Sequence, residues 1–223
     1  LRVRGLCGCA PCLTADKCYG VIDSNFDEGD VSAFTPASTN AASGGPIALN
    51  SAWYAFGQDT DSGSGACNNI QISVAGGVGT ANHNGAAETE CRAHLYQCVK
   101  VPPFNPTTQR LRFSFDQQVT GTSSDEIPQV IIGSQCHTVA DSSYSAGWWP
   151  NYGGNTLFSH SEKPTDLTSF DYHVSQQLAA YQGQTVMIGV SSFDQGAGTI
   201  TNMVDNIQLR VEGPGCEGVF ATD

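Results

Sequence analysis

The sequence has few charged residues and no long apolar run. Only 13% of its 223 residues are Asp, Glu, Lys or Arg, and 21 acidic residues against 9 basic ones give a formal net charge of −12. Nucleic acids and anionic membranes are bound through clusters of Lys and Arg, so this balance argues against both partners. No apolar stretch approaches the ~20 residues of a transmembrane helix. We therefore predict no membrane span, and no signal peptide is visible.

The common catalytic motifs are also missing. The sequence contains no His-Glu-x-x-His, Gly-x-Ser-x-Gly or Ser-x-x-Lys. Of the five histidines, His94 and His173 fall on predicted outward faces of strands, where a solvated imidazole is the ordinary case. Asp125 and Glu126 cannot act as a glycosidase pair, because adjacent residues of a strand point to opposite faces. We therefore expect a protein that is not an enzyme.

Cysteine, by contrast, is abundant. Nine cysteines spread over the chain indicate an oxidising compartment and a disulfide framework, so we expect a secreted, extracellular or cell-surface protein. The pairing cannot be deduced from the sequence, and the odd count leaves one thiol free, reactive or paired between molecules. These residues are Cys7, Cys9, Cys12, Cys18, Cys67, Cys91, Cys98, Cys136 and Cys216.

The composition divides the chain into three parts. Residues 1–20 form a Cys-rich N-terminal arm with four of the nine cysteines, residues 21–213 form the main domain, and residues 214–223 form a C-terminal tail. The Cys-x-Cys-x2-Cys run of the arm could bind zinc, but disulfides are the preferred interpretation in a chain with scattered cysteines. Leu1–Leu6 alternates weakly and could pair with a sheet edge, its own or a neighbour's.

Period-two alternation recurs through residues 21–213 and predicts an all-β fold. Leu111, Phe113 and Phe115 alternate with polar residues, and similar short segments follow at intervals, separated by Gly, Pro, Asn and Ser. Helical periodicity is limited to one turn near Gln176–Tyr181. Ten or eleven strands of this kind predict two packed antiparallel sheets, that is, a β-sandwich or jelly roll.

The last long strand, Thr199–Glu212, contains one residue that conflicts with this pattern. From Met203 onward, Asp205 falls in phase with Ile207 and Leu209 on the apolar face. A carboxylate that enters a core must be paired, hydrogen-bonded or bound to a metal. Near the start of the domain, Asp27 and Asp30 lie in an acidic turn of the kind that supplies oxygen ligands to Ca²⁺, although such a turn is also commonly a solvated one.

Five segments resemble, in the correct order, the extracellular jelly-roll modules of the galactose-binding-like group, which includes carbohydrate-binding modules and MAM-type adhesion domains. The segments are NFDEGDVSAF, CVKVPPFNPTTQRLRFSF, SSDEIPQVIIG, SFDYHVSQQLAAYQGQTVMIGVSSF and VDNIQL. The resemblance implies a jelly-roll β-sandwich. It also implies a structural cation, here Ca²⁺, between the opening acid at Asp27, where the family usually has Glu, and the closing Asp205. Asp30 could compensate for the shorter side chain.

The aromatic loop that contains Trp148, Trp149 and Tyr152 is the predicted carbohydrate-binding surface. Sugars present C–H faces that stack on exposed aromatic rings. The alternative is a loop that buries both indoles over a sheet edge. Trp53 and Tyr54 lie inside a predicted strand and are assigned to the core and its boundary.

Two functions follow. The first is a secreted, disulfide-stabilised β-sandwich module for extracellular binding or adhesion, with carbohydrate or an extracellular protein as partner. The alternative is a structural subunit of an extracellular filament, sheath or coat that self-assembles through its N-terminal arm, with the ninth cysteine locking the joint.

Overall fold

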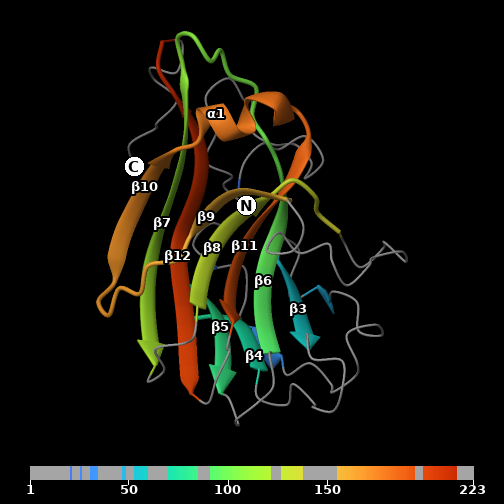
Figure 1. Ribbon diagram of the computed structural model, residues 1–223, viewed down its shortest axis with the longest axis vertical. Helices are drawn as coiled ribbons and strands as arrows, with labels where there is room; N and C mark the ends of the chain where they lie inside the picture. Colours follow the sequence, from blue (N-terminus) through green and yellow to red (C-terminus); the bar gives the residue numbers. More distant parts are fainter. Residues whose placement is uncertain are drawn as a thin grey trace.

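The computed structural model describes residues 21, 26, 31–34, 47–48, 53–59, 70–84, 91–121, 127–137, 155–193 and 198–214. The described residues form twelve strands, one short α-helix and one 3-10 turn (Figure 1). None of the helical segments among them is long and apolar enough to cross a membrane.

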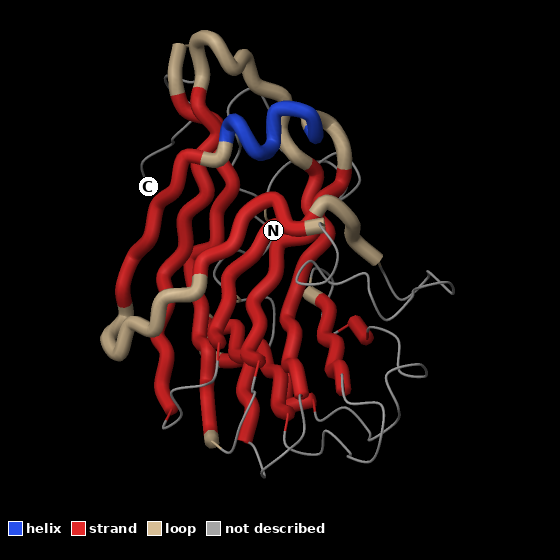
Figure 2. Tube along the Cα trace, in the orientation of Figure 1, coloured by secondary structure: helices blue, strands red, loops and turns tan. Residues whose placement is uncertain are grey.

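The strands lie in two six-stranded antiparallel sheets that face each other, as Figures 1 and 2 show. The first sheet has the order β1-β4-β5-β12-β7-β10 and the second has the order β2-β3-β6-β11-β8-β9. The strands of the first sheet are β1 (Val31–Phe34), β4 (Ile70–Ala75), β5 (Val78–Asn84), β12 (Thr199–Glu212), β7 (Arg110–Gly121) and β10 (Thr168–His173). Those of the second are β2 (Ile47–Ala48), β3 (Tyr54–Asp59), β6 (Cys91–Lys100), β11 (Thr185–Phe193), β8 (Ile127–Gly133) and β9 (Thr156–His160). The chain therefore has the antiparallel jelly-roll sandwich that the sequence and its resemblance predicted.

The core lies between the two sheets and follows the predicted alternation. In β7, Leu111, Phe113 and Phe115 are buried while Arg112 and Ser114 are only partly so. The inward side chains of β6, β8 and β11 complete the same cluster from the second sheet. Each sheet hides one apolar face against the other, which is the arrangement that stabilises a sandwich.

The sequence suggests one strand at residues 69–79 and a loop at residues 80–90, but Ile70–Asn84 is a hairpin of two strands. Gly76 and Gly77 have φ angles of +61° and +80° and turn the chain between β4 and β5. A two-residue turn with positive φ at both positions matches the twist of the flanking strands, and Gly-Gly is one of the dipeptides that adopt it. The sequence likewise suggests one strand at residues 47–57, but that segment contains β2 and the start of β3.

The helical turn predicted near Gln176–Tyr181 is confirmed. Helix α1 (Ser175–Leu178) continues into the 3-10 turn η2 (Ala179–Tyr181), and together they connect β10 to β11 across the end of the sandwich (Figure 2). Leu178 is buried in the core, so this connection closes one end of the apolar interior.

Candidate functional site

The closing strand β12 contains an irregularity that moves Asp205 out of the core. Before it Asn202 and Val204 are buried, and after it Ile207 and Leu209 are buried, so the phase changes by one residue. The register with β7 shifts between Asp205 and Gln208, and Asn206 has a φ of +51°. An inserted residue of this kind is a β-bulge, and Asn tolerates the left-handed conformation better than most residues do. The expectation that Asp205 shares the apolar face is therefore wrong.

Asp205 lies on the outer face of the first sheet, opposite Asp116 of β7. The Asn206 amide donates a 2.7 Å hydrogen bond to Asp116, and the Ser169 hydroxyl donates another to the same carboxylate. Partial burial raises the pKa of Asp205. The backbone N–H of Asn206 partly offsets this shift, and the charge of Asp116 adds to it.

The proposed calcium site is only partly within the described residues. Asp205 could offer one carboxylate to a cation, but Asp27 and Asp30 lie outside the part of the chain that the structure describes. Among the described residues, no group of three or more His, Cys, Asp or Glu side chains is placed to hold a metal. The structural Ca²⁺ remains a prediction from the resemblance.

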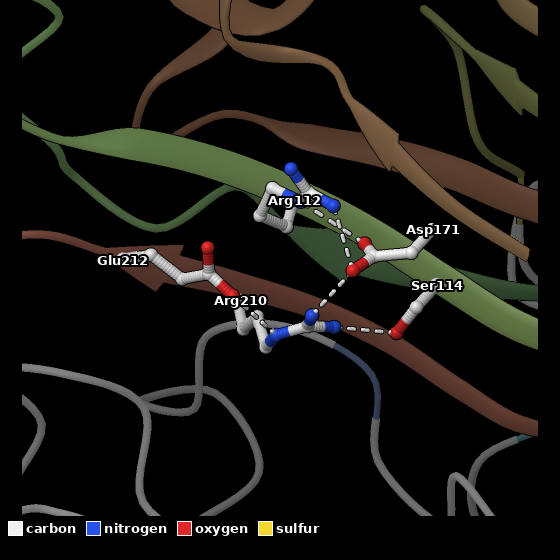
Figure 3. A network of polar contacts seen from close by, with 5 residues as sticks. All are labelled: Arg112, Ser114, Asp171, Arg210 and Glu212. Carbon is white, nitrogen blue, oxygen red and sulfur yellow. Dashed lines mark hydrogen bonds and ion pairs between the residues drawn. The ribbon is translucent and has the colours of Figure 1, made fainter.

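Three strands of the first sheet share an ion-pair network on their outer face (Figure 3). Arg112 of β7 lies directly opposite Arg210 of β12, and like charges in this position repel each other. Asp171 of β10 joins them, with its Oδ2 2.7 Å from Arg112 Nη2 and 2.9 Å from Arg210 Nη2. Arg210 also donates to Ser114 and, at 3.1 Å, to Glu212. The network ties β10, β7 and β12 together.

Asp171 is the anionic centre of this network. Burial alone would raise the pKa of its carboxyl, but the hydrogen bonds and charges of Arg112 and Arg210 outweigh that effect and hold the pKa below its usual range. Because both oxygens of Asp171 accept guanidinium hydrogen bonds, both guanidinium groups are held in fixed orientations. The outer face of the first sheet therefore presents rigid donors and acceptors beside each other.

A second polar arrangement crosses the interior of the sandwich. Asn202 donates to the backbone carbonyls of Ser191 at 2.9 Å and of Gln129 at 3.3 Å, and its side-chain oxygen accepts a 2.8 Å bond from Gln117. The Gln117 oxygen in turn lies 2.9 Å from His160 Nε2. These side chains are buried, and they link β12 and β7 of the first sheet to β11, β8 and β9 of the second.

The direction of these hydrogen bonds fixes the tautomer of His160. Since the Gln117 amide nitrogen donates to Asn202, its oxygen must accept, so His160 Nε2 carries the hydrogen. Nδ1 then accepts from the hydroxyl of Tyr172, 2.6 Å away. Burial among aromatic rings such as Phe115 and Phe170 lowers the pKa of His160, against a smaller opposing effect of the Glu162 charge.

We expect the stability of the protein to fall as the pH falls through about 6.5, the ordinary pKa of histidine. The folded state binds a proton at His160 only at a lower pH than the unfolded chain does. Below pH 6.5 protonation therefore stabilises the unfolded state first, and the free energy of unfolding decreases. The decrease ends at the lower pH at which His160 of the folded state is protonated as well. The measurement is urea unfolding at pH 5.0 to 8.0 of the wild type and of His160→Gln. The comparison of the two proteins removes the contribution of the other histidines. If the free energy of unfolding changes with pH by the same amount in both proteins, the expectation is contradicted.

The middle of the outer face of the second sheet is buried, unlike that of the first. Phe56, Tyr96, Ile131 and Met187 form a second apolar cluster there. His94 lies on this face and is fully buried, so the sequence placed it on the correct side of its strand but was wrong about its solvation. An outward position of a strand is solvated only where nothing covers the sheet.

One disulfide lies within the described residues and belongs to this face. Cys98 of β6 is bonded to Cys136, which follows β8. The Tyr96 hydroxyl donates to the backbone carbonyl of His137 at 2.9 Å, next to the same bridge. The bridge and this hydrogen bond hold residues 134–137 against the second sheet. The disulfide framework that the sequence predicted is thus confirmed for this pair.

Several predicted positions belong to parts of the chain that the structure does not describe. Trp148, Trp149 and Tyr152 lie outside the described residues, as do the N-terminal arm and six of the remaining cysteines. Trp53 is fully buried and packs on Phe26, as expected for a core residue. The exposed position predicted for His173 is also confirmed.

Sequence reasoning missed both polar networks. Gln117 offered a signal, because it falls in phase with the buried Phe113 and Phe115. Asn202 offered none once the alternation was counted from Met203, since the bulge reverses the phase. The role of Asp171 depends on two strands that are distant in sequence, and nothing local to residue 171 indicates it.

No protein-family model matches the chain, and no curated protein matches it in sequence. Among solved structures, a cyclase from Fischerella sp. TAU is similar, with 13% identity, a TM-score of 0.43, and coverage of 86% of this chain and 96% of that one. A family 11 carbohydrate-binding module from Clostridium thermocellum has 11% identity, a TM-score of 0.35, and coverage of 78% and 94%. The adhesin domain of Epf from Streptococcus pyogenes has 11% identity, a TM-score of 0.43, and coverage of 81% and 63%. Similarity of this degree says nothing about activity or ligand.

Proposed function

We propose that this chain is an extracellular binding module, rather than an enzyme, and that carbohydrate is its class of ligand. The observation that carries the proposal is the outer face of β7, β10 and β12. There Arg112, Asp171 and Arg210 are held by one another in fixed orientations and remain partly accessible to solvent. Sugar hydroxyls both donate and accept hydrogen bonds, so a rigid surface with both kinds of group is suited to them. Groups that are fixed before binding lose little entropy when the ligand arrives.

Two further features support an extracellular binding role. The Cys98–Cys136 disulfide is typical of proteins from oxidising compartments. The aromatic loop with Trp148 and Trp149 would add stacking surfaces for sugar rings. The alternative function, a filament or coat subunit, depends on residues 1–20, which lie outside the described residues. A clean monomer on electrophoresis and negative-stain microscopy, with and without reductant, would exclude that alternative.

We expect wild-type protein to bind members of a broad glycan array and Asp171→Asn to lose about tenfold or more in affinity. The substitution removes the charge that orients both guanidinium groups, and hydrogen bonds to charged groups contribute about 1.5–3 kcal/mol each. Trp148→Ala should weaken binding independently. Asp166→Asn is the matched control, because Asp166 is an exposed acid in the connection before β10 and outside the network. If wild-type protein binds no glycan on the array, the proposed function is overturned. If Asp171→Asn and Asp166→Asn lose the same amount of affinity, the role of Asp171 is overturned.

A further inference from the structure

A pocket of about 620 Å³ adjoins the ion-pair network at one end of the first sheet. Residues of the turn at 105–109, the start of β7, the end of β10 and helix α1 line it, and Figure 1 labels α1 at this end of the sandwich. Arg110, His173 and Gln176 are among the nine residues that line it, and none of the nine is Asp or Glu. The pocket lining therefore carries the positive charge of Arg110 and no negative charge.

The guanidinium of Arg110 forms no ion pair with any described residue. Its cross-strand partner is Glu212, but the carboxylate of Glu212 is held by Arg210 at 3.1 Å. Arg112, the next residue on the same face, is held by Asp171. Asp171 and Glu212 thus hold Arg112 and Arg210, and Arg110, which is exposed, is the arginine of these strands that remains.

His173 brings a second nitrogen-bearing group to the same place. It lies opposite Arg112 on β10, so Arg110, two residues along β7, is its diagonal neighbour on the same face. Its Nε2 lies 2.8 Å from the hydroxyl of Ser175, and that hydroxyl accepts a 2.7 Å hydrogen bond from the Leu111 amide. The imidazole is therefore fixed at the pocket by a buried serine.

The opposite wall of the pocket is also fixed. The Asn105 side chain accepts from the Thr107 amide at 3.0 Å, and the Gln109 side chain accepts from the Asn105 amide at 2.8 Å. Gln109 also donates to the carbonyl of Pro214. A turn held by its own side chains changes little when a ligand binds, so the pocket is formed in advance.

We propose that this pocket binds one anionic group, a carboxylate or a sulfate, carried by an acidic sugar, with Arg110 as the principal contact and His173 beside it. The planar guanidinium offers paired N–H donors that match the oxygens of such a group. The acidic remainder of the chain repels long polyanions, so the geometry selects a single charged substituent on an otherwise neutral glycan. This inference rests on the proposed function and names the class of sugar.

The test is an array of uronic-acid and sulfated oligosaccharides, each printed beside its methyl-esterified or unsulfated counterpart. We expect wild-type protein to prefer the acidic member of a pair, and Arg110→Gln to lose about tenfold or more of that binding while it retains binding to the neutral member. Arg110→Lys keeps the charge but lacks the paired N–H donors of the guanidinium group. Its affinity for the acidic oligosaccharides should therefore lie between those of the wild type and Arg110→Gln. Lys163→Gln is the control for net charge, because Lys163 is exposed in the connection at the far end of β10.

The outcomes separate this inference from the proposed function. If wild-type protein binds neutral glycans only, the proposal of an anion-binding pocket is wrong and that of a binding module is retained. The same conclusion follows if Arg110→Gln and the wild type bind acidic glycans with equal affinity. If no glycan binds, both are wrong. Equal losses in Arg110→Gln and Lys163→Gln would show an effect of net charge and overturn the specific contact.

Discussion

Replacement of Asn202 by leucine should lower the free energy of unfolding by about 3–5 kcal/mol, the range expected when a buried hydrogen-bond network is broken. Asn202 is fully buried and makes hydrogen bonds to Gln117, Ser191 and Gln129. Leucine has a similar shape but leaves the Gln117 amide and two carbonyls without these partners. Each buried polar group left in this way costs about 1–3 kcal/mol. Urea unfolding at pH 7.5, where His160 is neutral, measures the change.

A second variant distinguishes loss of the network from loss of packing. In Asn202→Leu with Gln117→Leu, the buried donor of Gln117 is removed as well, so the double variant should be more stable than the sum of the two single changes predicts. Gln177→Leu, at an exposed position of α1, is the surface control and should change stability by less than about 0.5 kcal/mol. Strict additivity of the two leucine substitutions would contradict a direct link between residues 117 and 202.

Removal of the Cys98–Cys136 disulfide should be almost as costly. The two cysteines are separated by 38 residues, and closing a loop of that length stabilises the folded state by up to about 4 kcal/mol through the entropy of the unfolded chain. We therefore expect Cys98→Ser with Cys136→Ser to lower the unfolding free energy by about 2–4 kcal/mol. The paired substitution avoids leaving a free thiol that could exchange with other disulfides.

The disulfide prediction has an internal control. A reducing agent acts on every disulfide of the chain, whereas the paired serine variant reports on one of them. Wild-type protein and the variant should differ when both are unfolded without reductant, and that difference should shrink when both are reduced. Identical unfolding curves without reductant would show that the bridge does not form, and would remove one support for an oxidising compartment.

Local alternation was sufficient for most of the secondary structure. The bounds of β12 agree with the predicted strand Thr199–Glu212, and the alternating residues Leu111, Phe113 and Phe115 lie in β7 as predicted, because each run of alternating residues is long enough to define its faces. The β4–β5 hairpin was missed because the Gly76-Gly77 turn was read as part of a strand. Positive φ at two consecutive glycines is a turn signal that the hydrophobic pattern does not contain.

The candidate site was less predictable, and Asp205 shows why. Period-two counting assigns a residue to a face only if the strand is regular throughout. One inserted residue at Asn206 leaves Ile207 and Leu209 inward as predicted but turns Asp205, before it, to the outer face. The same counting placed His94 on an outward face and could not show that this face is covered. A pattern along one strand holds no information about what packs on top of the sheet.

The sequence by itself determined that this protein is an all-β sandwich with an acidic and charge-poor chain, since composition and alternation act within a few residues of each position. Only the tertiary structure decided which polar groups meet. Asp171 orients two arginines, Gln117 reaches Asn202, and Arg110 is left without an ion pair among the described residues, because strands distant in the chain become neighbours in a sheet. The energy of a charge or a buried amide depends on those neighbours, and the identity of the neighbours is set by the register between strands.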